Sequence, residues 1–231
     1  MTDEPATTAS ISSLSKAERA AIVLCGGRST RMGLPKATLP FGSELMLQRV
    51  VRLVSEVVGT VVVVSAPGQE LPTLPAGVIY AEDRESGRGP LEGLAAGLSS
   101  LPVEITATYA TSCDVPLLSP LFVERLFHLL GDYDIAVPRE EKFHHPLAAV
   151  YRPRVLSHVE QLLAADRLRP FFLFEAAHTL EVPVEELRDV DPELDSLMNL
   201  NHPADYLAAL AKAGFEPDPE VLRKLGAIPS P

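Results

Sequence analysis

Glycines and cations are concentrated in one short segment, residues 24–36, with the sequence LCGGRSTRMGLPK. Its chemically notable members are Gly26, Gly27, Gly33, Arg28, Arg31 and Lys36. Glycines let backbone amides approach an anion closely, an arginine can form forked hydrogen bonds with phosphate oxygens, and a lysine supplies a point charge. The spacing matches neither the P-loop nor the GxGxxG pattern. The residues therefore leave two interpretations open, a phosphate-binding loop and a glycine-rich surface turn with solvated cations.

A second candidate is Asp114, which follows the apolar segment 105–112 in the sequence CDVP. Alone, an aspartate at such a position is often only a cap of the loop. A nucleoside triphosphate, however, needs a divalent cation, and Mg²⁺ binds one or two carboxylates together with phosphate oxygens and water. The cationic loop and Asp114 together therefore predict a magnesium–triphosphate site.

These residues can meet only if the chain brings the ends of several strands to one edge of a sheet. Apolar runs predict buried strands at 20–24, 60–65, 78–81, 105–112, 135–138 and 147–151. Helical spacing of apolar residues, with Ser or Pro at the starts, predicts helices from near Ser43 to 58 and at 90–101, 119–130, 153–165, 170–177 and 203–212. This alternation predicts an α/β fold, a single three-layer Rossmann-like domain with a mostly parallel central sheet. Ligands of such sheets bind beyond the carboxyl ends of the strands.

Size and charge narrow the possible functions. A chain of 231 residues, 46% of them hydrophobic, can bury one core, which we expect at 18–213. We expect a disordered N-terminal tail at 1–17 and a poorly ordered C-terminal extension at 214–231. The formal net charge of −11 argues against nucleic acid and anionic membranes as partners. No apolar run approaches the roughly 18 residues needed to span a bilayer, and residues 1–16 lack the apolar region of a secretory signal.

The two cysteines, Cys25 and Cys113, provide neither a disulfide framework nor a paired metal-ligand spacing. This pattern fits a reducing cytoplasm, where we place the protein. Both cysteines stand at predicted strand ends, so they can be neighbours in space.

Six blocks of the sequence, in this order, closely resemble the molybdenum cofactor guanylyltransferase family (molybdopterin-guanine dinucleotide biosynthesis protein A-like) within the GT-A-type nucleotidyltransferases. They are LCGGRSTRMGLPKATLPFG from residue 24, ED at 82–83, GPLEGLAAGL at 89–98, CDVPLL at 113–118, HPLAAVY at 145–151 and NLNHPADY at 199–206. Because the blocks extend over most of the chain in the right order, the resemblance is far more specific than any one motif.

The resemblance implies roles for individual residues. By this resemblance the nucleotide-binding residues would be Leu24, Cys25, Gly26, Lys36, Asp83 and Asp114, and the chemistry of the loop itself adds Gly27 and Arg31. Among these, Asp114 would hold the metal, and it would act in catalysis together with Lys36 and Arg31. The acceptor-side candidates are His145, Arg169, Asn199 and Asn201. His145 follows another histidine, but the pair does not match the HExxH zinc pattern, so we interpret it as lining the acceptor pocket or leading into a strand.

The family resemblance implies a Mg²⁺-dependent transfer of GMP from GTP to molybdenum-molybdopterin, with release of pyrophosphate. Molybdoenzymes or their chaperones would be transient partners. The segment VVVVSAPG lacks an asparagine that some members have after the second strand, and this leaves the base open. The alternatives are a related enzyme that uses CTP or another phosphorylated acceptor, and a non-catalytic nucleotide-binding homologue.

Overall fold

A computed structural model describes residues 14–26, 31–85 and 87–226 of the chain. Within these ranges an eight-stranded sheet forms the centre of the molecule, with the strand order β10-β7-β9-β6-β1-β4-β5 and β8 paired with β7. The strands are β1 (Arg19–Leu24), β4 (Thr60–Ser65), β5 (Ile79–Glu82), β6 (Ala107–Ser112), β7 (Ile135–Glu140), β8 (Phe143–His144), β9 (Ala148–Tyr151) and β10 (Thr179–Pro183). The four strands from β6 to β5 are parallel, and β9 runs antiparallel to β6 and β7. The predicted mostly parallel sheet is confirmed.

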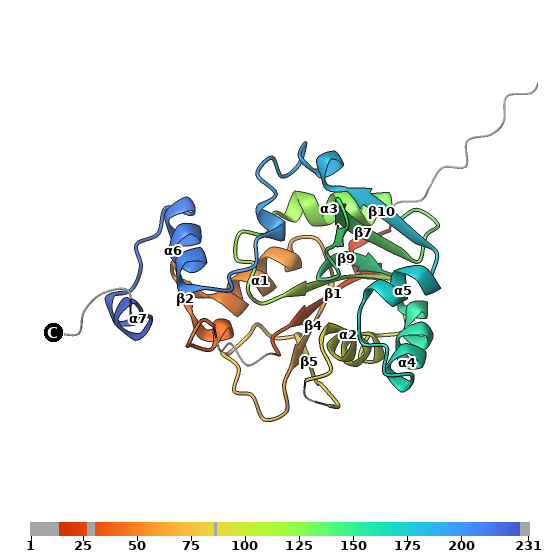
Figure 1. Cartoon of the computed structure of the whole chain (residues 1–231), viewed down its shortest axis with the longest axis horizontal. Coiled ribbons are helices and arrows are strands. Elements are labelled where there is room, and N and C mark those ends of the chain that lie inside the picture. Colours follow the sequence, from red (N-terminus) through yellow and green to blue (C-terminus); the bar gives the residue numbers. More distant parts are fainter. Residues whose placement is uncertain (1–13, 27–30, 86, 227–231) are drawn as a thin grey trace, which may run out of the picture.

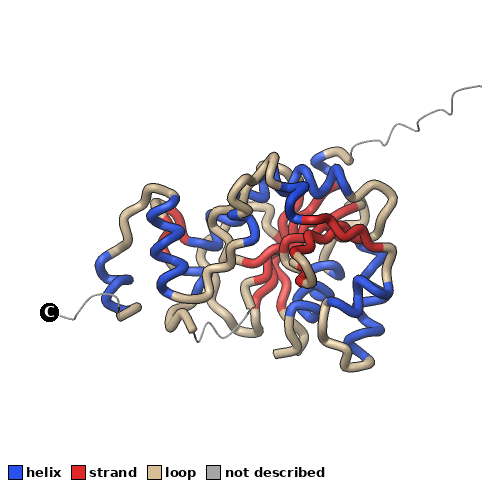
Figure 2. Tube along the Cα trace, turned by 45° about the horizontal axis from the view of Figure 1, so that its top comes forward, coloured by secondary structure: helices blue, strands red, loops and turns tan. Residues whose placement is uncertain are grey.

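Helices cover both faces of this sheet, as Figure 1 shows. They are α1 (Met46–Ser55), α2 (Pro90–Ser99), α3 (Pro120–Leu129), α4 (Leu156–Ala164), α5 (Phe171–Ala176), α6 (Pro203–Lys212) and α7 (Pro219–Lys224). Figure 2 shows the strands between two groups of helices, with the C-terminal helices beside them at the end marked C. The three-layer α/β architecture therefore agrees with the expectation from the sequence.

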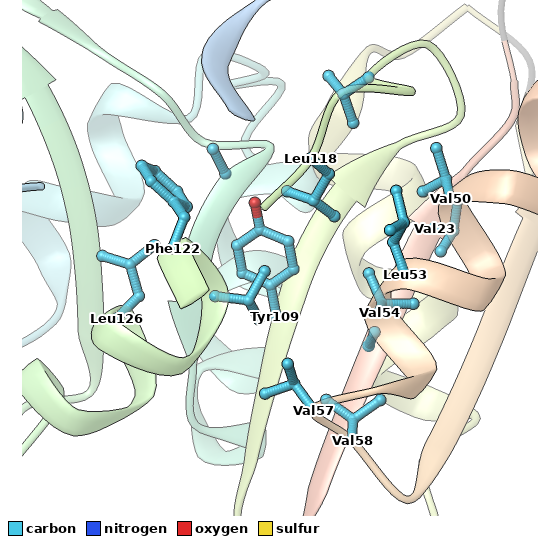
Figure 3. Packing of buried hydrophobic residues seen from close by; sticks show 14 of the residues in the cluster. Val23, Val50, Leu53, Val54, Val57, Val58, Tyr109, Leu118, Phe122 and Leu126 are labelled. Atoms are coloured by element: carbon cyan, nitrogen blue, oxygen red, sulfur yellow. The ribbon is translucent and has the colours of Figure 1, made fainter. Parts of the chain in front are cut away.

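The alternation of side chains along β1 explains the two main cores. Val23 points into a cluster formed with α1 and α3, whereas Ile22 points into a cluster formed with α2, α4 and α5. In Figure 3 the ring of Tyr109, from β6, lies between the labelled side chains of α1 and those of α3. All six residues of β1 are buried, as the apolar run 20–24 predicts for a strand covered on both faces.

A third core joins the loop after β1 to the C-terminal helices. Its buried members are Met32, Leu39, Phe41, Met46, Leu200, Tyr206, Ala209, Leu210 and Val221. We expected poor order in the C-terminal extension; over residues 214–226 the chain instead forms α7 and buries Val221 in this third core. Burial of apolar side chains supplies the free energy that orders this short segment.

Two local predictions were wrong. Ser43 does not cap α1, because it lies with Gly42 in the turn of a short hairpin between β2 (Pro40–Phe41) and β3 (Glu44–Leu45). Gly42 has a φ of +67°, which favours a tight turn over a helix start, and α1 begins four residues later, at Met46. The strand β10 was not predicted; only Val182 of its five residues is buried, so its hydrophobic pattern is weak.

The described part of the chain begins with a 3₁₀ turn at Lys16–Glu18, which leads directly into β1. Residues 1–13 of the expected tail lie outside the described residues, and β1 begins at Arg19. The carbonyl of Lys16 accepts a hydrogen bond from the N–H of Gly59 at 2.8 Å, which ties the start of the described chain to the sheet. No helix in the described ranges has the length and apolar content that crossing a bilayer would require.

Candidate functional site

The residues that directly follow three parallel strands, β1, β5 and β6, lie at one edge of the sheet. The N–H of Cys25 donates to Val64 at 2.8 Å, and the N–H of Cys113 donates to Leu24 at 3.0 Å. The N–H of Asp83 likewise donates to Ser65 at 3.0 Å. Sheet-like hydrogen bonding therefore continues one residue past β1, β5 and β6, and it brings the residues that follow these strands to the same carboxyl edge.

An ion pair at this edge joins Lys36 to Asp114. The Lys36 ammonium lies 2.6 Å from Asp114 Oδ2 and also donates to Asn201 Oδ1 at 2.9 Å. The two side chains of the ion pair are only 15% and 11% exposed, so water screens the pair weakly. Ser112 Oγ donates to the other carboxylate oxygen of Asp114, and the carbonyl of Asp114 accepts the N–H of Leu200 at 2.9 Å. One cation thus bridges two oxygen ligands whose positions are fixed by further hydrogen bonds.

The three residues of this group meet because each follows or precedes an element that begins or ends at the same edge of the sheet. Lys36 opens a 3₁₀ turn at Lys36–Thr38, after the loop that follows β1. Asp114 follows β6, and Asn201 stands before α6, where Asp205 accepts the N–H of Asn201 at 3.0 Å and that of His202 at 2.8 Å. The helix start therefore fixes the loop that presents the asparagine.

Beside this group lies a cavity of 370 Å³. It is lined by Leu24, Gly26, Val64, Asp83, Gly87, Gly89, Pro90, Gly93, Ser112 and Leu147. Two of the lining glycines leave space for the Asp83 carboxylate, because a Cβ on Gly26 would lie 3.1 Å from Oδ2 and one on Gly93 would lie 3.2 Å from Oδ1. Burial and, second, the nearby Glu92 carboxylate raise the pKa of Asp83. The cavity therefore presents one partly desolvated acid among backbone and apolar groups.

The two cysteines are neighbours, as their places in the sequence suggested. Both are buried and free at adjacent strand ends, and hydrogen bonding to Cys113, followed by burial, raises the pKa of Cys25 well above its ordinary value. The Cys25 carbonyl accepts a hydrogen bond from Gln69 Nε2 at 3.2 Å. The Cys25 thiol is therefore neutral and unreactive, and the hydrogen bond from Gln69 fixes the Cys25 backbone.

Among the described residues, Arg31, His145, Arg169 and Asn199 form no hydrogen bond or ion pair with Lys36 or Asp114. Gly27 lies outside the described residues, and Arg31 is exposed on the turn that follows it. Arg169 and Asn199 are exposed. His145 is half-buried with Nε2 3.9 Å from a Glu140 oxygen, and burial lowers its pKa, although Glu140 opposes this.

Three residues of the site were not singled out in the sequence. Ser112 orients Asp114, and its position two residues before an acid at a strand end was the available signal. Gln69 lies after β4, near the place where an asparagine was sought, and its Oε1 accepts the N–H of Ala66 at 3.1 Å while Nε2 reaches Cys25. Arg49 reaches the turn after Asp114 from α1, for which the sequence offers no local signal.

The residues around Lys36 fit a divalent cation. Among the described residues, no three His, Cys, Asp or Glu side chains are grouped as a metal cage. Asp114 and Asn201 nevertheless offer the carboxylate and amide oxygens that Mg²⁺ takes when phosphates and water complete its shell. That an ammonium already lies between these oxygens indicates that this point of the site favours positive charge.

Comparison with known proteins places this geometry in context. Residues 21–180 match the model of the MobA-like NTP transferase domain. The chain is 36% identical over 200 residues to a probable molybdenum cofactor guanylyltransferase of Mycobacterium avium, with 84% of this chain and 95% of the relative covered. A similar relative from Methanosarcina acetivorans is 34% identical over 199 residues, which cover 79% and 86% of the two chains.

Solved structures show the same fold. The crystal structure of molybdopterin-guanine dinucleotide biosynthesis protein A from Archaeoglobus fulgidus has a TM-score of 0.70 at 22% identity and covers 85% of this chain and 98% of its own. A 2-C-methyl-D-erythritol 4-phosphate cytidylyltransferase from Thermus thermophilus has a TM-score of 0.60 at 17% identity, with coverages of 86% and 99%. The fold alone therefore does not distinguish which base is used.

Proposed function

The chain belongs to the family of MobA-like NTP transferase domains and is a nucleotidyltransferase, and on this premise we propose that it transfers GMP from GTP to molybdenum-molybdopterin. The observation that carries the proposal is the Lys36 ammonium held between Asp114 and Asn201, beside the cavity that Ser112 lines. If a triphosphate binds there, Lys36 would supply a positive charge to its phosphates, and Asp114, which follows β6, would supply a ligand to its metal ion. The names of the relatives support guanylyl transfer to a molybdenum cofactor.

In the proposed reaction, a phosphate oxygen of the acceptor attacks the α-phosphorus of GTP in line. A bond from this oxygen to phosphorus forms as the bond to the β-phosphate oxygen breaks, and pyrophosphate leaves. The attacking phosphate is already anionic, so a general base is not required. Positioning and charge neutralisation therefore supply most of the rate acceleration.

The chain's own residues divide these tasks. Asp114 and Asn201 would hold Mg²⁺, which neutralises charge on the phosphate oxygens when it is bound. Lys36 would move from Asp114 to the phosphates and stabilise the leaving pyrophosphate, with Arg31 and the amides of the glycine-rich loop beside it. On the acceptor side, His145, Arg169 and Asn199 are the residues that we propose to approach the pterin.

Asp83 favours guanine as the base. The Watson–Crick edge of guanine offers two adjacent donors, N1–H and the N2 amine, whereas cytosine presents acceptors at N3 and O2. A carboxylate accepts two hydrogen bonds but donates none while it is ionised. The Asp83 carboxylate in the cavity wall therefore complements guanine better than cytosine.

The proposal is tested by release of pyrophosphate from each of the four triphosphates, with and without metal-loaded molybdopterin and Mg²⁺. We expect release only with GTP and only when the acceptor is present. Turnover with CTP in preference to GTP would replace the guanylyl assignment with a cytidylyl one. Tight GTP binding without turnover on a competent acceptor would instead show a non-catalytic homologue.

A further inference from the structure

The side chain of Arg49, on α1, connects the turn that carries Asp114 to the hairpin β2–β3. Its Nε donates to the carbonyl oxygen of Pro116 at 2.7 Å, and its Nη1 lies 3.6 Å from Glu44. Its guanidinium lies over the ring of Phe41, 5.0 Å from the centroid. The Arg49 side chain is only 18% exposed, so water screens these contacts weakly.

Phe215, in the C-terminal extension, completes the arrangement. Its ring meets that of Phe41 edge to face, with centroids 5.6 Å apart, and the Arg49 guanidinium lies 5.5 Å from its centroid. Gly42 makes room for the ring, because a Cβ there would lie 2.7 Å from the Phe215 Cζ. The N–H of Phe215 donates to Leu210 at 2.9 Å, so α6 fixes where the extension begins.

Helix α6 and the C-terminal extension that follows it together support the loop that carries Lys36. Met32 and Leu39 of that loop are buried in the third core with Val221 of α7, and the Tyr206 hydroxyl donates to the carbonyl of Pro40. The matched family model ends at residue 180, so this segment lies outside it. Both partners of the Lys36–Asp114 pair are thus reached from the part of the chain that follows the segment matched by the family model.

We propose that Phe215 and Arg49 are positioning residues for Asp114, through which the C-terminal extension sets the geometry of the metal site. Arg49 holds the turn at Pro116 in place, and Phe215 holds the guanidinium of Arg49 against Phe41. This inference rests on the proposed function, because it takes Asp114 as the metal ligand.

A purely structural role would lower stability without changing the metal site of the folded protein. A positioning role predicts weaker metal binding in variants that remain folded. The readout is therefore the affinity for Mn²⁺ in the presence of saturating GTP, measured by electron paramagnetic resonance on the full chain, with thermal unfolding followed in parallel. This measurement does not need the acceptor.

The variants are Arg49→Ala, Phe215→Ala and the double variant, with Asp114→Ala as the positive control. Arg52→Ala is the matched negative control, because Arg52 also lies on α1 and pairs with Glu44 at 2.8 Å, but without the contact to Pro116. Arg49→Lys and Phe215→Leu replace the alanine variants if these fail to fold.

We expect Arg49→Ala to weaken Mn²⁺ binding on the order of tenfold, as loss of a group that orients a metal ligand does. Phe215→Ala should weaken it less, and it should have little further effect in the Arg49→Ala background because both act through one contact. With a competent acceptor, kcat should fall while KM for GTP stays nearly constant.

Four results decide the matter. Unchanged Mn²⁺ affinity in folded Arg49→Ala, or fully additive effects in the double variant, would overturn the inference. Unchanged affinity in Asp114→Ala would overturn it as well, because the metal would then bind elsewhere. Coupled losses of Mn²⁺ affinity without any transfer by the wild-type chain would refute the proposed function and leave the positioning role standing.

Discussion

The ammonium of Lys36 lies 2.6 Å from the carboxylate of Asp114, although 78 positions separate the two residues in the chain. The lysine thus occupies the carboxylate oxygen that our proposal gives to a metal ion. An ammonium and a divalent cation compete for such a ligand, since each neutralises the same charge. A triphosphate that draws Lys36 to its phosphates would free Asp114 at the moment when the metal is needed.

Lys36→Ala should therefore separate metal binding from nucleotide handling. Without nucleotide, the variant should bind Mn²⁺ more tightly than the wild type, because the competing ammonium is gone. With GTP and acceptor, kcat/KM should fall on the order of a hundredfold, since a group that stabilises transition-state charge is lost. Titration of Mn²⁺ followed by steady-state kinetics measures both effects.

Lys212→Ala is the matched control for this experiment. Lys212 also forms an ion pair, with Asp195 at 2.5 Å, but it lies on α6 and its side chain is 40% exposed. Neither Mn²⁺ affinity nor turnover should change in this variant. Weaker metal binding in Lys36→Ala without nucleotide would refute the competition.

Asp83→Asn should raise the thermal stability of the protein near neutral pH and weaken its handling of GTP. The pKa of Asp83 is raised above its ordinary 3.8, so the folded state binds this proton more tightly than the unfolded state does. Such a group contributes stability at low pH and loses it as pH rises from 3.8 through the raised value. An uncharged amide avoids this loss, so the melting temperature of the variant should exceed that of the wild type near neutral pH and converge with it in acid.

The functional cost of Asp83→Asn follows from the proposed contact with guanine. Loss of the charged hydrogen-bond acceptor for guanine should raise KM for GTP by about tenfold or more. If Asp83 contacted only the phosphates, the effect of the substitution would not depend on the base of the triphosphate. A melting temperature difference that grows toward acid would contradict the pKa argument, and unchanged KM would remove Asp83 from the base site.

The sequence predicted those parts of the fold and site that depend on local patterns. The fully buried strand β1 is an uninterrupted apolar run, and Ser119 with Pro120 marks the start of α3 as expected. Asp114 and Lys36 could be paired because both follow strands of one parallel sheet. By contrast, β10 buries only Val182, and an edge strand with so little burial leaves a weak hydrophobic pattern.

Contacts that depend on side-chain direction between remote elements could not be predicted. Arg49 lies on the polar side of an amphipathic helix pattern, and nothing in its neighbours indicates that its guanidinium reaches Pro116. The C-terminal extension has the proline and charge content of a tail, yet Phe215 meets Phe41 because Gly42 lacks a side chain. Such complementarity arises only once the tertiary structure brings the surfaces together.

Gly97→Ala tests the close approach of α2 to the sheet. A Cβ at this position would lie 2.5 Å from Cγ2 of Ile22, which is fully buried in β1. Alanine is favoured over glycine in a helix by about 1 kcal/mol, but overpacking of a rigid core costs about 1–3 kcal/mol. We expect a net loss of stability in urea unfolding, and this loss should shrink in an Ile22→Ala background, which removes the atoms that the new Cβ would meet. A more stable Gly97→Ala variant would show that α2 can move away from β1 without cost.

Ser112→Ala tests whether the second oxygen of Asp114 must be fixed. The Ser112 hydroxyl donates to Oδ1 of Asp114, while Lys36 contacts Oδ2, so each oxygen of the carboxylate has its own partner. Without the hydroxyl, the carboxylate can rotate about its last bond, and Oδ2 no longer points steadily at the metal position. Groups that orient a metal ligand in this way contribute about tenfold to a hundredfold in metal affinity.

The Ser112→Ala variant should therefore bind Mn²⁺ at least several-fold more weakly in the presence of GTP, on the scale of other lost orienting hydrogen bonds. Ser112→Thr retains the hydroxyl and should recover most of the affinity. Ser100→Ala is the matched control, because Ser100 donates to the Ala96 carbonyl at 2.9 Å at the end of α2 and does not contact Asp114. Equal Mn²⁺ affinities for wild type and Ser112→Ala would contradict this prediction, because the metal would then be insensitive to the carboxylate oxygen that Ser112 holds.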